Sequence, residues 1–139
     1  MKRVLVDAGP LVAILSSDDA QHETCLNTLR QLSGPLLSCW PVITEAAWLL
    51  RSLPRAVQQL LAAIDGSFLE LLPLRGAEAQ EISKLMRKYE DVRPQLADMA
   101  LVYLAARESI ETIFTLDRRD FLIYRPRGRR TFRIVPEVE

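Results

Sequence analysis

Apolar and polar positions follow one another along this chain in two different rhythms. Short runs that are mostly apolar predict strands at residues 4–7, 36–39, 68–72, 112–115 and 132–135. Between these runs, apolar residues spaced three and four apart predict helices at residues 11–15, 23–32, 41–53, 57–64, 78–89 and 96–108. Pro10 and Pro41 are placed to open helices, and Pro54 closes the one that begins at Pro41.

This alternation of strands and helices favours right-handed crossovers and a parallel sheet with helices on both faces. We therefore predict an α/β fold of three layers, α/β/α, around a mostly parallel, five-stranded central sheet. No repeat or linker divides the chain, so residues 1–139 are predicted to form a single domain. The longest apolar stretch, residues 99–106, is much shorter than the roughly 20 residues of a membrane helix, and the start lacks the apolar region of a secretory signal. We expect no membrane span and a cytoplasmic protein.

The charges of the chain are balanced overall but unevenly distributed. Eighteen basic and eighteen acidic residues give a formal net charge of zero, which provides no general attraction to a phosphate polymer. Seven basic residues are concentrated near the C-terminus: Arg118, Arg119, Arg125, Arg127, Arg129, Arg130 and Arg133. This segment could bind a polyanion, contact an acidic partner or simply be solvated.

The cysteines and three aromatic residues carry structural predictions. Cys25 and Cys39 are too few for a disulfide framework and too far apart for a CxxC pair, so we predict reduced packing residues. Trp40, Trp48 and Tyr103 could stack on nucleic-acid bases, but aromatic residues at helical spacing usually belong to the core, and we predict them there.

Four acidic residues are predicted to meet at one edge of the sheet. Asp7 ends the first strand, Asp117 follows the fourth, and Glu45 lies in the opening turns of the helix after the second. Asp98 lies near the start of the helix that precedes the fourth strand, which is at the same edge because that helix runs back across the sheet. The carboxyl edge of an open parallel sheet is where functional crevices form.

Crowded carboxylates repel one another, and no Lys or His is evidently placed to neutralise them. A divalent cation would neutralise them, and ligands that are all oxygen favour Mg²⁺ or Mn²⁺. Such a site suits phosphodiester hydrolysis. Each acid also has a structural alternative. Asp7 and Asp117 could cap the start of a helix or turn, and Glu45 could pair with a surface arginine. Asp98 could be placed in the first turn of its helix because the helix dipole favours an acid there.

The order of the motifs resembles the PIN-domain family, and within it the VapC-like toxins. The likeness covers essentially the whole chain and rests on VLVDAGPLVA around Asp7, PVITEA around Glu45, LADMAL around Asp98, and FTLDRRDF with Thr115, Asp117 and Asp120. After the first acid, many family members carry Ser or Thr where this chain has Ala8 and Gly9, so one hydroxyl contact is expected to be missing.

The resemblance implies a five-stranded parallel sheet and endonucleolytic cleavage of single-stranded or loop RNA with Mg²⁺ or Mn²⁺. By motif match, the catalytic and metal-binding residues are Asp7, Glu45, Asp98 and Asp117. Thr115 would support the pocket and Asp120 would be a supplementary acid, although Thr115 could be only a strand former and Asp120 only a solvated turn residue.

The resemblance also implies partners, namely a homodimer and an antitoxin whose segment covers the pocket of a toxin. Arg118, Arg119, Arg125 and Arg127 are the candidate RNA-binding residues. Two other functions compete with the ribonuclease: a PIN-like module that binds RNA or protein without cutting, and a receiver-like signalling domain. The second fits poorly, because Asp7 is single and the late segment offers only arginines where a receiver carries a lysine.

Overall fold

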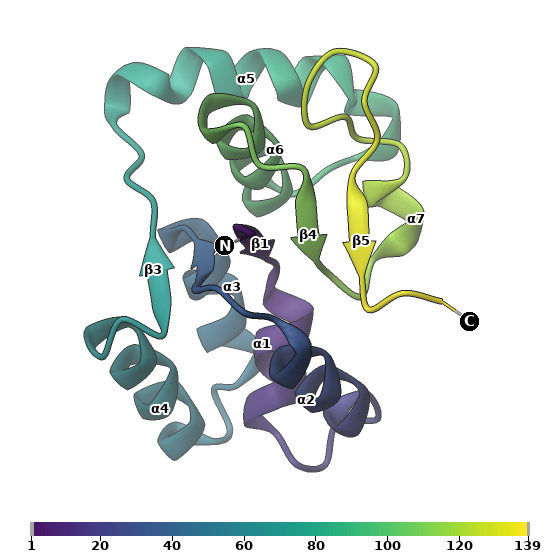
Figure 1. Cartoon of the computed structure of the whole chain (residues 1–139). Helices are drawn as coiled ribbons and strands as arrows, with labels where there is room; N and C mark the ends of the chain where they lie inside the picture. The colour runs from purple at the N-terminus through teal and green to yellow at the C-terminus, as the bar shows by residue number, and fades with distance from the viewer. Residues whose placement is uncertain (1, 139) are drawn as a thin grey trace.

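Five parallel strands form the centre of the protein. The computed structural model describes residues 2–138, which leaves Met1 and Glu139 of the predicted domain outside the described residues. The strands are β1 (Val4–Val6), β2 (Leu36–Ser38), β3 (Leu69–Leu71), β4 (Thr112–Phe114) and β5 (Arg133–Val135). They lie in the order β3-β2-β1-β4-β5, and every pair is parallel (Figure 1). The α/β prediction with five strands is confirmed, and the sheet is fully parallel where a mostly parallel one was expected.

The helices connect the strands and flank the sheet. They are α1 (Ala8–Leu15), α2 (His22–Gln31), α3 (Trp40–Leu49), α4 (Pro54–Asp65), α5 (Ala79–Lys88), α6 (Leu96–Glu108) and α7 (Arg118–Phe121), with short 3₁₀ helices η1 (Gly76–Glu78) and η2 (Glu90–Val92). The helix predicted at 41–53 is shorter, since α3 ends at Leu49 and a turn leads to Pro54. The four residues of α7 are too few to show a period, and α7 was not predicted.

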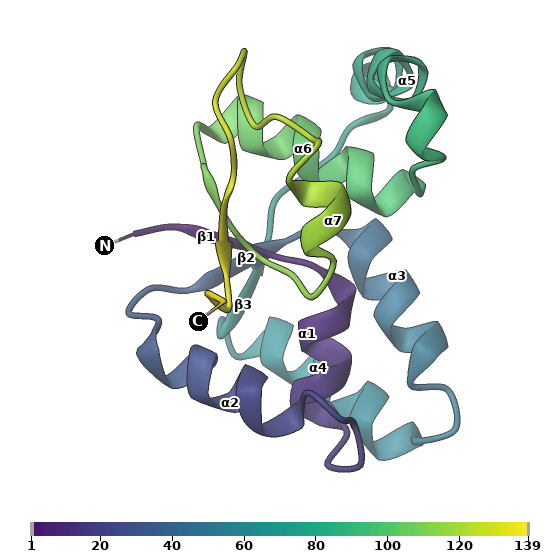
Figure 2. The same cartoon turned by 90° about the vertical axis from the view of Figure 1, so that its right-hand side faces the viewer.

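The order of the strands places a switch of direction beside β1. The chain moves outwards from β1 to β2 and β3, and then returns through α5 and α6 to β4 on the other side of β1. Because crossovers are right-handed, the outward and the return connections cover opposite faces. Figure 2 shows α5 and α6 on one side of the strands and α1, α2 and α4 on the other. Such a switch point is where open α/β sheets leave a crevice at the carboxyl ends of their strands.

The core lies between the sheet and its helices. All three residues of β1, β2 and β4 are buried, and α6 buries seven of its side chains. Cys25 and Cys39 are free and buried, as predicted. Among the described residues, no helix is long and apolar enough to cross a membrane.

The prediction that the tryptophans belong to the core is wrong. Trp40 is 59% exposed and Trp48 is 64% exposed. Helix α3 is apolar around much of its circumference, and Val42, Ile43 and Ala46 fill the side that is buried. Apolar periodicity could not distinguish the two sides, so the prediction assigned both tryptophans to the core although they lie on the surface. Tyr103 is half-buried, and its hydroxyl donates a hydrogen bond to Glu78.

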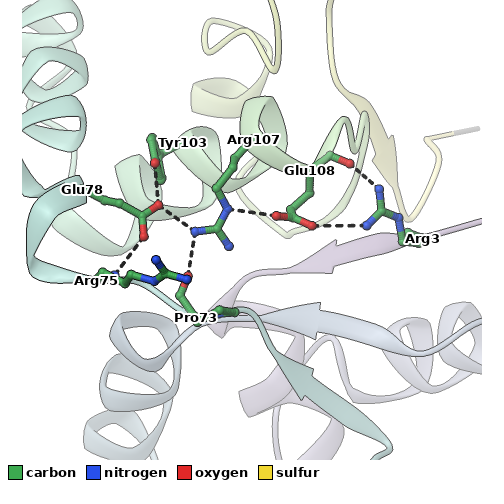
Figure 3. Close-up of polar contacts among 7 residues, drawn as sticks. All are labelled: Arg3, Pro73, Arg75, Glu78, Tyr103, Arg107 and Glu108. Carbon is green, nitrogen blue, oxygen red and sulfur yellow. Dashed lines mark hydrogen bonds and ion pairs between the residues drawn. The ribbon is translucent and has the colours of Figure 1, made fainter.

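A chain of polar contacts fastens α6 to the segments on either side of it (Figure 3). The Arg107 guanidinium donates to the Glu78 carboxylate at 2.7 Å and to the carbonyl of Pro73 at 2.7 Å. It also pairs with Glu108 at 2.9 Å, which in turn pairs with Arg3 before β1 at 3.6 Å. One end of α6 is therefore tied both to the η1 segment and to the beginning of the sheet.

Candidate active site

A cavity of about 520 Å³ opens at the carboxyl edge of the sheet. It is lined by Asp7, Gly9, Glu45, Leu49, Arg93, Gln95, Asp98, Leu116, Asp117 and Asp120. The four acids that the sequence predicted as catalytic, and the supplementary Asp120, all line this one space. They come from the ends of β1 and β4 and from the first two turns of α3, α6 and α7.

Asp7 lies at the centre of the edge, directly after β1, and is 7% exposed. Its Oδ1 accepts a 2.8 Å hydrogen bond from the backbone N–H of Ala8, so it caps α1. Its Oδ2 accepts a 2.8 Å hydrogen bond from the Thr115 hydroxyl. Burial raises the pKa of Asp7, and these two hydrogen bonds lower it only partly. The capping role weighed for Asp7 is real, and it coexists with a position in the cavity wall.

Thr115 connects the two central strand ends. It is fully buried after β4, and its Oγ1 accepts a 3.0 Å hydrogen bond from the backbone N–H of Asp117. Asp117 itself caps α7, since its Oδ1 accepts from the N–H of Asp120 at 3.2 Å. One hydroxyl therefore contacts the side chain of one acid and the backbone of another.

Three carboxylates of the cavity approach one another closely. Asp98, Asp117 and Asp120 each present an oxygen within 4.8 Å of the others. Burial, and then the charges of Asp7, Glu45, Asp117 and Asp120, raise the pKa of Asp98 to about 7. Burial, together with the repulsion among these groups, therefore favours a proton on Asp98 at a pH where an ordinary aspartate is ionised.

Glu45 completes the set from α3. It is half-buried, and burial followed by the charge of Asp7 raises its pKa. Its helical neighbours Trp48 and Leu49 are exposed, so Glu45 is only partly surrounded by buried apolar residues. The helical neighbours of Asp98, namely Leu101, Val102 and Ala105, are buried.

Several residues of the site were not predicted from the sequence. Arg93, Gln95 and Leu49 line the cavity, and the Tyr124 hydroxyl lies 3.5 Å from Oδ2 of Asp98. Tyr124 is buried, and its position depends on how residues 122–132 return to the sheet, which no periodic pattern describes. Arg93 had one usable signal, since it lies five residues before Asp98 in a segment predicted to break the helical pattern.

The four candidate RNA-binding arginines lie outside the cavity wall. Arg118 is half-buried and donates to the carbonyl of Pro136 at 3.0 Å, and Arg125 donates to that of Leu122 at 2.7 Å. Arg119 and Arg127 are exposed. Arg118 and Arg119 belong to α7, directly after Asp117, and are closer along the chain to the cavity than the other two.

Known proteins resemble this chain in sequence and in fold. A family model described as the PIN domain matches residues 4–125. Ribonuclease VapC26 of Mycobacterium tuberculosis is 29% identical over 135 residues, which cover 96% of this chain and 100% of that protein. The crystal structure of Mycobacterium tuberculosis VapC20, a toxin that cleaves the Sarcin-Ricin loop, superposes with a TM-score of 0.73 at 13% identity. That match covers 79% of this chain and 86% of the other and is a likeness of fold.

Proposed function

Because this chain belongs to the PIN-domain family, we propose that it is a metal-dependent endoribonuclease that hydrolyses phosphodiester bonds in single-stranded or loop RNA, as the toxin of a toxin–antitoxin pair. The observation that carries the proposal is the convergence of five carboxylates on one cavity at the switch point of the sheet. A receiver-like signalling domain is excluded by the family. Homology to ribonuclease VapC26 supports RNA as the substrate.

The donor atoms of the cavity fit a hard divalent cation. Its wall offers carboxylate oxygens and, among the residues that line it, neither the sulfur of a cysteine nor the nitrogen of a histidine. Burial first, and then the charges of the neighbouring carboxylates, raise the pKa of Asp98, so a bound cation would favour its ionised form. Mg²⁺ or Mn²⁺ would be held by Asp7, Glu45, Asp98 and Asp117, with Asp120 as the supplementary acid.

The chain's own residues prepare the site for this chemistry. When bound, such an ion supplies Lewis-acid stabilisation of charge on phosphate oxygens and activates water. Thr115 and the N–H of Ala8 fix the two oxygens of Asp7, which leaves the direction of that carboxylate little freedom. Asp117 is fixed by its own N–H bond to Thr115 and by the cap of α7. The acids are thus positioned before substrate arrives, which is the arrangement that catalysis requires.

We also propose a second copy of the chain and a protein antitoxin as partners. The exposed apolar side chains of α3, Trp40, Trp48 and Leu49, supply a surface that a homodimer would cover. An antitoxin segment with basic side chains would complement the acidic cavity. An apolar groove of about 510 Å³ lies between α1, α2 and α4. Helix α1 contributes Gly9 to the cavity and Leu11 to the groove, so the two spaces are neighbours along this helix. The groove would therefore hold an apolar part of the same antitoxin.

The decisive experiment is cleavage of structured and unstructured RNAs by the purified protein, with Mg²⁺, with Mn²⁺ and with a chelator. Asp7→Asn and Asp98→Asn are the test variants, and Asp65→Asn, an exposed acid at the end of α4, is the control. We expect metal-dependent cleavage by the wild type and the control only. Activity that survives chelation, or that is equal in all variants, would point to a contaminant. RNA binding without cleavage would favour the non-catalytic module.

The antitoxin is tested at the gene and in solution. A short open reading frame directly upstream, whose product binds this chain and stops RNA cleavage, is the expected finding. A chain without such a neighbour, active on RNA by itself, would be an RNA-processing enzyme and not the toxin of a pair.

A further inference from the structure

Among the residues that line the acidic cavity, Arg93 is the one with a positive charge. It shares the cavity with five carboxylates: Asp7, Glu45, Asp98, Asp117 and Asp120. The net charge of the chain is zero, so attraction of a phosphate polymer to this acidic edge has to come from local cations. Arg93 is the residue placed to provide one.

The backbone of Arg93 is held in an uncommon conformation. With φ of 56° and ψ of 56° it lies in the left-handed region, which costs a residue with a side chain on the order of 1–3 kcal/mol. Its N–H donates to the carbonyl of Glu90 at 3.0 Å and closes η2. Pro94 follows, and Gln95 occupies the position before α6, whose first turn carries Asp98. This turn brings a guanidinium and the Asp98 carboxylate to the same cavity with four residues between them.

Arg93 is not used as an internal counter-ion. Four arginines within residues 2–138 pair with carboxylates, namely Arg3, Arg107, Arg130 and Arg133. Within residues 2–138 the side chain of Arg93 makes no ion pair or hydrogen bond with a carboxylate, although five carboxylates line the same cavity. Its side chain is exposed, so the guanidinium is free to meet an anion that enters the cavity.

We propose that Arg93 is a substrate-positioning residue that binds a backbone phosphate of the RNA beside the one that is cut. This inference rests on the ribonuclease function proposed above. A guanidinium forms bidentate hydrogen bonds with phosphate oxygens and keeps its charge at any relevant pH. The carboxylates repel every phosphate except the one that a bound cation compensates, so a neighbouring phosphate needs its own positive partner at the rim.

The proposal is tested with Arg93→Ala and Arg93→Lys, against Arg87→Ala as the matched control on the exposed last turn of α5. Cleavage of a single-stranded RNA is followed in Mn²⁺ at several salt concentrations. We expect Arg93→Ala to lower kcat/KM roughly tenfold or more, chiefly through KM, because a charge-assisted contact is lost. The slope of log kcat/KM against log salt should become shallower by about 0.7, the value for one phosphate contact on a single strand. Arg93→Lys should restore the slope and part of the rate.

Other results would overturn the inference. If Arg93→Ala matches Arg87→Ala in KM and in salt slope, Arg93 contacts no phosphate. If Arg93→Ala instead weakens Mn²⁺ uptake by calorimetry or lowers Tm, its role is structural. A wild-type protein that cleaves no RNA would remove the proposed function and this inference together, whereas a wild type that cleaves normally while Arg93→Ala is unchanged removes the inference alone.

Discussion

The Thr115 hydroxyl donates a 2.8 Å hydrogen bond to Oδ2 of Asp7, across 108 positions of sequence. The hydroxyl oxygen of Thr115 in turn accepts a 3.0 Å hydrogen bond from the backbone N–H of Asp117. Both contacts are made possible by β1 and β4 lying side by side, with Leu5 opposite Ile113 and Val6 opposite Phe114. The register of two central strands therefore fixes how far apart two of the acids lie.

We predict that Thr115→Val lowers activity and stability together. The substitution keeps the shape of the side chain but leaves the N–H of Asp117 without its partner and removes a hydrogen bond that lowers the pKa of Asp7. We expect kcat/KM to fall roughly tenfold and the free energy of unfolding in urea to fall by about 1–3 kcal/mol.

Thr115→Ser provides the control, because it keeps the oxygen that makes both contacts. It should retain most of the activity, with a small loss of stability from the missing methyl group. If the valine variant cleaves RNA as fast as the serine variant, the hydroxyl does not position the acids.

The stability of the metal-free protein should depend on pH through Asp98. Its pKa of about 7 in the fold lies above the ordinary value of 3.8, so the folded protein holds this proton more tightly than the unfolded chain does. The stabilisation is therefore complete below the ordinary value and is lost as the pH rises through about 7. Asp98→Asn removes the titrating group.

At pH 8, in the presence of a chelator, Asp98→Asn should be more stable than the wild type by on the order of 1–2 kcal/mol in urea unfolding. At pH 5 the difference should be smaller, and it should nearly vanish only below the ordinary value of 3.8, where Asp98 is protonated in both the folded and the unfolded state. Mn²⁺ should reverse the order at pH 8 by raising the Tm of the wild type more than that of the variant. A wild type with a flat pH profile, or a variant that is less stable in chelator, contradicts the crowding of the carboxylates.

Much of the fold was predictable, because strands and helices that are buried on a regular face leave a period in the sequence. Helix α6 was predicted with its exact bounds, and the strands to within one residue at each end. The errors arose where burial has no period. Helix α3 is apolar at exposed positions too, so the prediction made the helix too long and buried its outer face. Helix α7 was missed because it is a single turn.

The acidic part of the site was predictable for a different reason. The carboxyl ends of parallel strands lie at one edge, so Asp7 and Asp117 had to be neighbours once the strands were recognised. Arg93 and Tyr124 could not be placed in this way. Their positions follow from a left-handed turn and an irregular loop, where the path of the chain depends on tertiary contacts such as the Tyr89–Tyr124 ring packing at 5.0 Å.

The outer face of α3 gives a prediction about assembly. Trp48 is 64% exposed and lies 4.0 Å from the guanidinium of Arg51, measured to the ring centre. If a second copy covers this face, Trp48→Ser should shift the mass measured by light scattering from dimer towards monomer. Phe68→Ser, at a residue of the groove wall that is 79% exposed, should leave the mass unchanged. A monomeric wild type would remove the homodimer proposal.

The contacts of Arg107 should contribute to stability and not to catalysis. Hydrogen bonds from Tyr103 first, then from the Arg75 backbone and Arg107, lower the pKa of Glu78 to about 2 (Figure 3). This stabilisation is present above the ordinary value of 4.5 and is lost as the pH falls through about 2. We expect Arg107→Ala to lower Tm by about 3–6 °C at pH 7, less at pH 3, with kcat/KM and Mn²⁺ uptake unchanged at low temperature. Lys84→Ala, which breaks only the exposed pair with Glu81, should leave Tm within about 1 °C. An Arg107 variant with normal Tm would mean that α6 is held by its apolar contacts alone.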